Sequence, residues 1–179
     1  MRKLLFVLAA VCTCSISFAQ DNSSTKISRN SFFAELGGAG IMFSANIDHR
    51  FTQSNLGFGG RIGLGFVTAY EYDTVNYSSY YYSDDPVSTI TVPVQLNYIF
   101  GKANSPHTFE VGAGVTYVGK ELEIMNFYDE RQSKLFGTFS FMYRRQPKDG
   151  GFTWRIGFTP LFAKGYIQSF GGAGLGYNF

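Results

Sequence analysis

Cysteine is nearly absent from this 179-residue chain, and both copies, Cys12 and Cys14, lie within its first twenty residues. The rest of the chain therefore has no thiol, which excludes disulfides and thiolate metal sites there. Histidine is almost as rare, with only His49 and His107. Because so few side chains suit nucleophilic, acid–base or metal chemistry, we expect no catalytic residue, no metal site and no cofactor.

Long hydrophobic runs are also missing beyond the leader. Arg2 and Lys3 precede the apolar run Leu4–Val11, and Ala19 offers a cleavage site, as in a secretory signal peptide. This run is far shorter than the roughly 20 residues of a membrane-spanning helix. The sequence therefore predicts a signal peptide over 1–19, a flexible N-terminal segment over 20–30 and a folded domain over 31–179.

A clear excess of either positive or negative charge is lacking as well. The chain has 15 basic and 13 acidic residues, and loss of Arg2 and Lys3 with the leader leaves 13 of each. Nucleic-acid binding needs a basic footprint, so we do not expect it. What the chain does have is glycine (21 residues) and aromatic side chains (18%), a composition typical of closed all-β structures.

Apolar side chains recur at every second position over segments of about ten residues. Between Leu56 and Tyr70, for example, the even positions are mostly large and apolar, whereas the odd ones include four glycines and Arg61. This pattern is typical of a membrane barrel with one face toward lipid. It predicts an all-β, transmembrane, antiparallel up-and-down β-barrel in the outer membrane, with strands in the segments 56–70, 90–100, 109–117, 135–143, 152–162 and 171–179.

The number of strands depends on the glycine tract Gly37–Gly40. Apolar positions are even before this tract and odd after it, which indicates either a turn or a bulge. A turn gives two strands within 31–51 and eight in total, whereas a bulge gives one strand there and seven in total. We favour eight strands, with the last one closing against 32–36.

The connections between the predicted strands differ in length. Short ones lie at 101–106, 146–150 and 164–168, and long polar ones at 71–87 and 121–133. Outer-membrane barrels keep short turns in the periplasm and long loops outside. The long connections and 164–168 are therefore expected outside.

Several charged residues fall on the phase that faces the lumen. An eight-stranded barrel is only just wide enough for its side chains, so these charges are expected to pair in a buried network near the periplasmic strand ends. We interpret the network as a structural plug, with a narrow ion path or proton-linked site as the alternative. Its predicted members are Glu35, Asp48, Arg50, Arg61, Glu110, Arg144 and Arg155.

The outer half of the predicted lumen is lined by glycine and threonine. This lining favours close packing around Phe136, Met142 and Phe170. It also leaves open a small cavity that would suit an apolar ligand or an acyl chain.

Two outer loops carry most of the polar surface chemistry. The first is rich in tyrosine, and its candidates for binding an extracellular ligand are Tyr72, Tyr77, Tyr80, Tyr81 and Tyr82. The same tyrosines could instead cover the barrel mouth, next to an interfacial aromatic belt that includes Tyr70. The second loop is acidic, through Glu121, Glu123, Asp129 and Glu130, and solvated charge is favoured there over a weak cation site.

The final strand ends on an aromatic residue. Outer-membrane barrels present a terminal strand of this kind to the barrel assembly machinery. Leu175, Tyr177 and Phe179 share its apolar phase and are the expected assembly signal. His49 and His107 fall on the outward phase near the periplasmic turns, without a serine partner. A lipid-modifying hydrolase is therefore not expected.

The segments Tyr143–Gly151, Arg155–Phe162 and Gly174–Phe179, together with Glu35–Gly40, resemble a family of small, largely uncharacterised outer-membrane barrels of Bacteroidota. In architecture the chain is similar to OmpX-like and OmpA-like eight-stranded barrels. The resemblance implies no established activity. We expect a non-enzymatic outer-membrane protein of a Gram-negative cell, in contact with membrane lipid and lipopolysaccharide, with a structural or loop-displaying binding role. The alternative is a narrow, porin-like channel or a small barrel that handles an apolar ligand or lipid.

Overall fold

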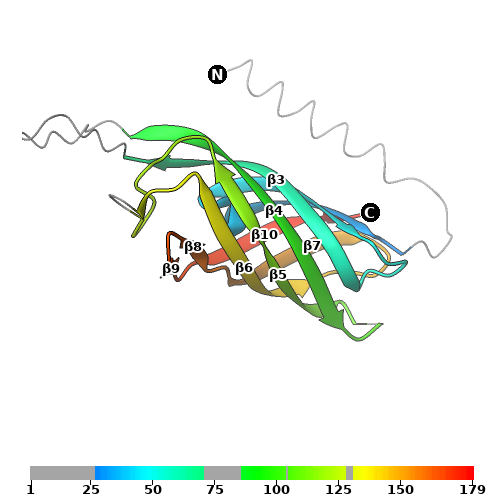
Figure 1. Cartoon of the computed structure of the whole chain (residues 1–179). Coiled ribbons are helices and arrows are strands. Elements are labelled where there is room, and N and C mark those ends of the chain that lie inside the picture. Colours follow the sequence, from blue (N-terminus) through cyan, green and yellow to red (C-terminus); the bar gives the residue numbers. More distant parts are fainter. Residues whose placement is uncertain (1–26, 71–85, 104, 128–130) are drawn as a thin grey trace, which may run out of the picture.

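The chain folds into a closed antiparallel β-barrel, shown as a computed structural model in Figure 1. The structure describes residues 27–70, 86–103, 105–127 and 131–179. Its elements are β1 (Asn30–Gly37), η1 (Gly38–Gly40), β2 (Phe43–Arg50), β3 (Gly57–Ala69), β4 (Val87–Gly101), β5 (His107–Val118), β6 (Leu135–Arg145), β7 (Gly151–Phe158), β8 (Leu161–Ala163), β9 (Tyr166–Gln168) and β10 (Gly171–Asn178).

Ten strand segments form eight strands of the wall. β7 and β8 both pair with β6, and they are separated only by Thr159 and Pro160. Proline has no backbone N–H to donate, so an interruption of the ladder there is expected. Ser169 and Phe170 separate β9 from β10 in the same way. The prediction of an all-β, up-and-down barrel of eight strands is confirmed.

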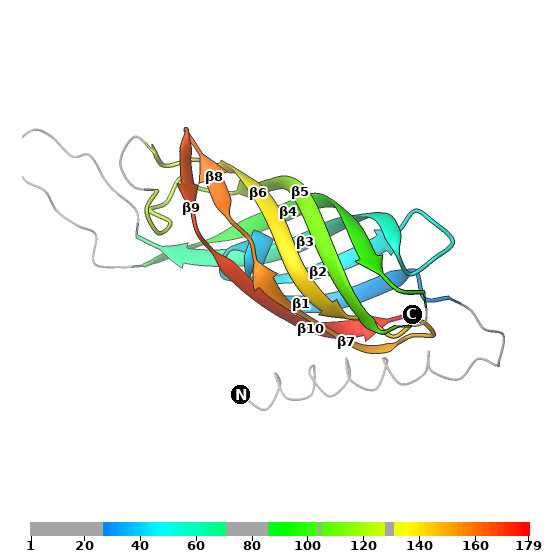
Figure 2. The same ribbon diagram turned by 90° about the horizontal axis from the view of Figure 1, so that it is seen from below.

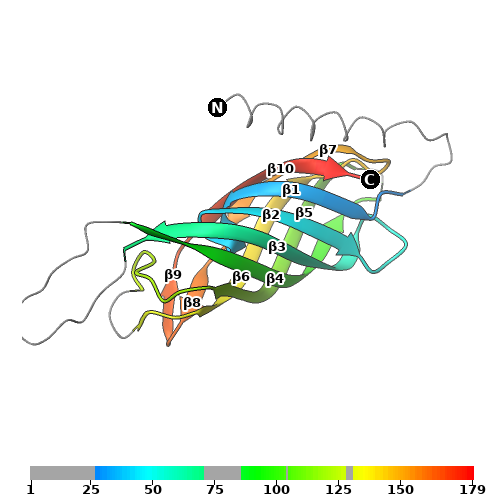
Figure 3. The ribbon, with the colours of Figure 1, turned by 90° about the horizontal axis from the view of Figure 1, so that it is seen from above.

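The first and last strands close the barrel, as Figure 3 shows with β1 beside β10. Phe32 lies opposite Tyr177 and Ala34 opposite Leu175, which is the closure that the sequence predicts. Backbone hydrogen bonds between Asn30 and Phe179 extend the pairing by one residue. The wall therefore begins at Asn30.

The glycine tract forms a turn, so residues 31–51 contain two strands, as favoured from the sequence. Gly37 and Gly38 have positive φ angles of 69° and 67°, which glycine adopts without steric cost. The tract forms the 3-10 turn η1, here called the inner turn, and all three of its residues are buried. The chain thus bends into the lumen instead of lengthening the wall.

The two ends of the barrel differ in their connections. The turn end carries the connections 51–56, 102–106 and 146–150, together with the start of β1 and the end of β10. The loop end carries the inner turn, the end of β3, the start of β4, residues 119–127 and the β8–β9 hairpin, which projects in Figure 2. The expected 164–168 connection is shorter than predicted, because only Lys164 and Gly165 form the turn. Both have positive φ, which suits a two-residue hairpin.

Burial is inverted relative to a water-soluble fold. Large apolar side chains such as Leu36, Leu64, Leu96 and Ile156 are more than half exposed on the outer surface, whereas most fully buried residues are polar or charged. The described residues contain no helix long and apolar enough to cross a membrane.

Candidate functional site: a lumen filled in two layers

All seven charged residues predicted to face the lumen are buried there, each with at most 3% of its surface exposed. Together we call them the ionic layer. Their ion pairs form one unbranched chain in which positive and negative groups alternate, and an arginine stands at each end. The order is Arg50, Asp48, Arg144, Glu110, Arg155, Glu35 and Arg61.

Arg144 is the best-bonded member of the ionic layer. Its Nη1 donates to Asp48 Oδ2 at 2.6 Å and to Glu110 Oε2 at 3.0 Å. Its Nη2 donates to Ser31 Oγ at 2.6 Å, and that hydroxyl in turn donates to Asn178. The residue therefore ties together β1, β2, β5, β6 and β10 across the lumen. Beyond Asp48, Arg50 continues the chain and also donates to the Gly57 carbonyl at 2.9 Å.

The other half of this series of ion pairs spans distances from 2.9 to 3.6 Å. Arg155 lies 2.9 Å from Glu110 Oε1 and 3.4 Å from Glu35 Oε1, and Arg61 lies 3.6 Å from the same Glu35 oxygen. The ring of Phe33 faces both guanidinium groups, with its centroid 4.8 Å from Arg155 Cζ and 5.6 Å from Arg61 Cζ. Cation–π attraction therefore adds to charge pairing at this end.

Glu35 departs from the predicted placement near the periplasmic strand ends. It lies two residues before the end of β1 that leads into the inner turn. β1 is short, so this position is deep in the lumen, where Glu35 meets Arg61 and Arg155 from neighbouring walls. The ionic layer thus reaches from the turn end up to the inner turn.

Neutral polar side chains complete the ionic layer, and sequence reasoning did not single them out. Asn97 binds both Arg50 and Asp48, and Gln95 accepts from Arg61 while donating to Thr138 at 2.6 Å. Both occupy the lumen phase of β4, so strand alternation is the signal that finds them. Phe33 shares its phase with Glu35 and could have been found in the same way.

Burial of so many charges demands pairing. Removing one partner from a buried pair costs about 3–5 kcal/mol, because the other charge is left unpaired. With four arginines and three carboxylates, the layer carries one excess positive charge. An arrangement in which every carboxylate lies between two arginines limits that cost.

The inner turn separates the ionic layer from the loop end. A Cβ placed on Gly38 would lie 2.5 Å from Glu35 Cδ, so the turn backbone rests directly on that carboxylate. On its other side, the carbonyl of Ala39 accepts from Thr116 Oγ1 at 2.6 Å and the carbonyl of Gly40 from Thr91 Oγ1 at 3.0 Å. The turn is therefore fixed to β4 and β5 across the lumen.

Apolar side chains fill the described part of the lumen beyond the inner turn. The connection after β5 folds inward, and its Phe127 packs edge-on against Phe136 of β6 with ring centroids 5.0 Å apart. Phe170 packs at the edge of this group, while Met142 is buried lower on β6 and accepts from Thr159 Oγ1 at 3.8 Å. The apolar cluster comprises Ile41, Val67, Val118, Leu122, Ile124, Phe127, Phe136, Leu161 and Ala163.

Not all candidates from the sequence lie within the part of the chain that the structure describes. Tyr72, Tyr77, Tyr80, Tyr81 and Tyr82 fall outside the described residues, and so do Asp129 and Glu130. Within the described part of the chain, no three His, Cys, Asp or Glu residues gather where they could hold a metal ion. His49 pairs with Asn30 Oδ1 at 2.7 Å and His107 with the Tyr143 hydroxyl.

Leu175, Tyr177 and Phe179 all face outward, with exposed fractions of 61%, 52% and 58%. They line one outer face of the strand that closes the barrel against β1. A broader set of outward aromatic side chains surrounds the turn end. Phe58 contacts Tyr98, and Tyr143 contacts Phe109 and Trp154, with ring centroids 4.8 to 5.6 Å apart.

The described residues thus define a closed eight-stranded barrel with an apolar exterior and a filled lumen. The chain is similar to the crystal structure of the N-terminal β-barrel domain of Pseudomonas aeruginosa OprF, with a TM-score of 0.53 and 13% sequence identity. The similarity covers 86% of this chain and 98% of the OprF domain. At this identity it shows the shared barrel fold alone. No protein-family model and no curated protein matches the chain.

Proposed function

We propose that this chain is an integral outer-membrane β-barrel protein with a sealed lumen, which acts structurally or displays its outer loops for binding. The observation that carries the proposal is the inverted burial: apolar side chains cover the outside, and charges are paired inside. A surface this apolar is unstable in water, whereas in a bilayer it replaces lipid–lipid contacts. The similarity to the OprF barrel domain supports the same placement.

The outer surface also supports a definite orientation in the membrane. The outward aromatic residues at the turn end have the position of an interfacial girdle, with Trp154 and Tyr143 among them. At the loop end, Tyr70, Tyr117 and Tyr166 are exposed and supply the second girdle. We place the turn end in the periplasm and the loop end outside, in contact with lipopolysaccharide.

Epitope tags inserted at the two ends test this placement. A tag between Lys164 and Gly165 should bind antibody on intact cells, whereas a tag between Lys148 and Asp149 should bind only after the outer membrane is permeabilised. Both sites are hairpin connections in the structure, which makes them matched insertions. Equal labelling of the two tags, or recovery of the protein in the soluble fraction, would contradict the proposal.

For assembly, we propose that the outward face of β10 is what the barrel assembly machinery recognises. Deletion of Phe179 should lower the amount of heat-resistant, membrane-inserted barrel, because it removes one of the three outward apolar residues and a backbone pair with Asn30. Shortening the tyrosine-rich 71–85 loop is the control, and it should leave assembly unchanged. Normal insertion of the Phe179 deletion would refute this part.

A further inference from the structure

The barrel wall has a gap above the inner turn. β2 pairs with β3 only as far as Phe43 opposite Phe66, but β3 continues alongside β4 to Ala69. On the other side, β1 pairs with β10 as far as Gly37 opposite Gly172, whereas β9 continues beyond that level alongside β8. The upper part of β3 and the β9–β10 segment are therefore neighbours without a strand between them.

The gap follows from the sequence of the inner turn. Gly37 and Gly38, both with positive φ, direct the chain inward, and Ile41 completes the turn with a φ of 74°. Positive φ is rare for a β-branched residue and is kept only where the surrounding structure requires it. Here it places Ile41 in the lumen with only 2% of its surface exposed, as part of the apolar cluster.

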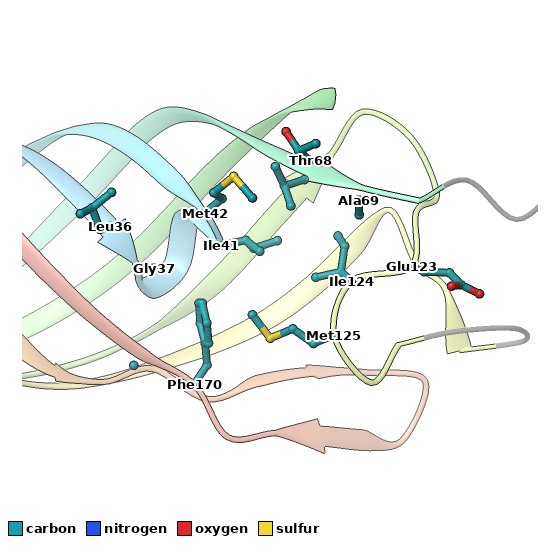
Figure 4. A pocket seen from close by; sticks show the side chains of 12 residues that line it. Leu36, Gly37, Ile41, Met42, Thr68, Ala69, Glu123, Ile124, Met125 and Phe170 are labelled. Carbon is teal, nitrogen blue, oxygen red and sulfur yellow. The ribbon is translucent and has the colours of Figure 1, made fainter. Parts of the chain in front are cut away.

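A pocket of about 500 Å³ occupies this gap (Figure 4). Its volume is within the range of roughly 300–1,000 Å³ that is usual for small-molecule sites, and an apolar cavity of roughly 150 Å³ already binds benzene. Glu123 is the single charged lining residue, and Figure 4 shows its carboxylate directed away from the apolar side chains. The lining residues that matter most are Leu36, Ile41, Val67, Ile124, Met125 and Phe170.

The pocket opens toward the outer surface of the barrel. Leu36 (66% exposed) and Met42 (42% exposed) line its mouth and continue the lipid-facing surface that includes Phe66. Tyr70, which directly follows β3, is exposed just beyond the mouth, at the level of the proposed membrane interface. Inward, the pocket ends on Ile41, Val67 and Ile124, which are buried members of the apolar cluster. Leu36 and Met42 thus place an opening of the pocket on the side of the barrel.

We propose that this lateral pocket binds one acyl chain of an outer-leaflet lipid, which enters through the gap between β3 and the β9–β10 segment. The inference rests on the proposed membrane location, because it takes its ligand from the bilayer. Three observations carry it: an apolar lining, a mouth continuous with the lipid-facing surface, and a floor that closes the route to the lumen. A water-soluble polar ligand would meet one carboxylate and no other charged group in the lining.

Photolabelling from within the bilayer tests the proposal. The full protein is inserted in phosphatidylcholine vesicles that contain a phosphatidylcholine with a diazirine on one acyl chain, irradiated and mapped by mass spectrometry. Leu64 and Leu96 face lipid and should be labelled in any inserted barrel. Val67 and Ile124 are only 3% and 2% exposed, so bulk lipid does not reach them. Label on these two residues is the expected result.

A pair of variants sharpens the test. Ala69→Phe fills the pocket from β3 and should lower labelling of Val67 and Ile124 about tenfold or more, which corresponds to about 1.4 kcal/mol. Ala113→Phe places the same ring on the exposed outer face of β5, away from the pocket, and should change nothing there. Labelling of Leu64 and Leu96 without Val67 and Ile124, or pocket labelling that Ala69→Phe leaves intact, would overturn the proposal. Absence of label on Leu64 and Leu96 as well would instead count against the membrane placement.

Discussion

The two halves of the lumen fill the same space with opposite chemistry. Toward the turn end, the ionic layer holds seven charges in one chain of ion pairs, whereas toward the loop end the apolar cluster excludes charge. The ionic layer is built from strand residues that are distant in sequence. The apolar cluster depends on two connections that fold inward, the inner turn and residues 119–127.

The two halves differ in how strictly their side-chain contacts fix the arrangement of the surrounding strands. Ion pairs and hydrogen bonds have strict geometry, so the ionic layer fixes the register of the strands that carry it, as the contacts of Arg144 show. Apolar contacts are non-directional and tolerate rearrangement. The upper half can therefore leave a lateral pocket while its buried apolar side chains stay packed, whereas a vacancy in the ionic layer would expose unpaired charge.

The largest expected effect comes from breaking the ionic layer at its best-bonded member. Arg144→Gln removes the shared partner of Asp48 and Glu110 and should lower the free energy of unfolding by about 3–5 kcal/mol. Urea titration of the refolded protein in vesicles measures it. Arg145→Gln is the matched control, because Arg145 is next in sequence but makes only a weak bond to the Phe152 carbonyl, at 3.4 Å. Equal losses for the two variants would contradict a stabilising ionic layer.

A smaller effect is expected from the apolar cluster. Leu122→Ala truncates a fully buried side chain of the inward-folded connection and should cost about 2–4 kcal/mol in the same titration. We expect the lower part of this range, because a connection relaxes around a cavity more easily than a strand. Leu135→Ala, at an exposed site on β6, should cost much less, since lipid takes the place of the lost methyl groups. A larger loss from Leu135→Ala would show that the cluster adds little stability.

The smallest effect tests the boundary between the halves. Gly165→Ala changes a hairpin glycine with a φ of 81°. The added Cβ would meet no atom within 4 Å apart from the residue and its two neighbours, so the substitution should cost about 1–2 kcal/mol through backbone strain alone. Gly38→Ala has a similar φ but also places Cβ against the Glu35 carboxylate, so it should cost at least about 1 kcal/mol more. If the two variants are equally stable, the inner turn does not rest on Glu35.

Strand alternation made much of this architecture predictable. Because the side-chain period of a strand is two, the phase of each segment assigned all seven members of the ionic layer to the lumen. The reversal of phase at Gly37–Gly40 located the inner turn for the same reason. Residues such as Gln95 and Asn97 were within reach of the same argument, but their neutral side chains gave no reason to single them out.

The rest depends on information that alternation does not contain. Strand alternation assigns a side chain to the lumen or to the outer surface, but it does not give its position along the barrel axis. The deep position of Glu35 therefore follows only from the shortness of β1. Nor does a turn prediction say whether the turn extends the wall or folds inward. The inner turn and residues 119–127 are placed by tertiary packing, and the lateral pocket exists because of both.

Ion conductance of the purified protein in planar bilayers tests the central claim most directly. The heat-dependent gel mobility of the folded barrel is checked first, so that a lack of conductance cannot result from a lack of folded, inserted protein. With the ionic layer below and the apolar cluster above, the inserted barrel should show no reproducible conductance steps. Discrete, repeatable openings of the unmodified protein would contradict the sealed lumen.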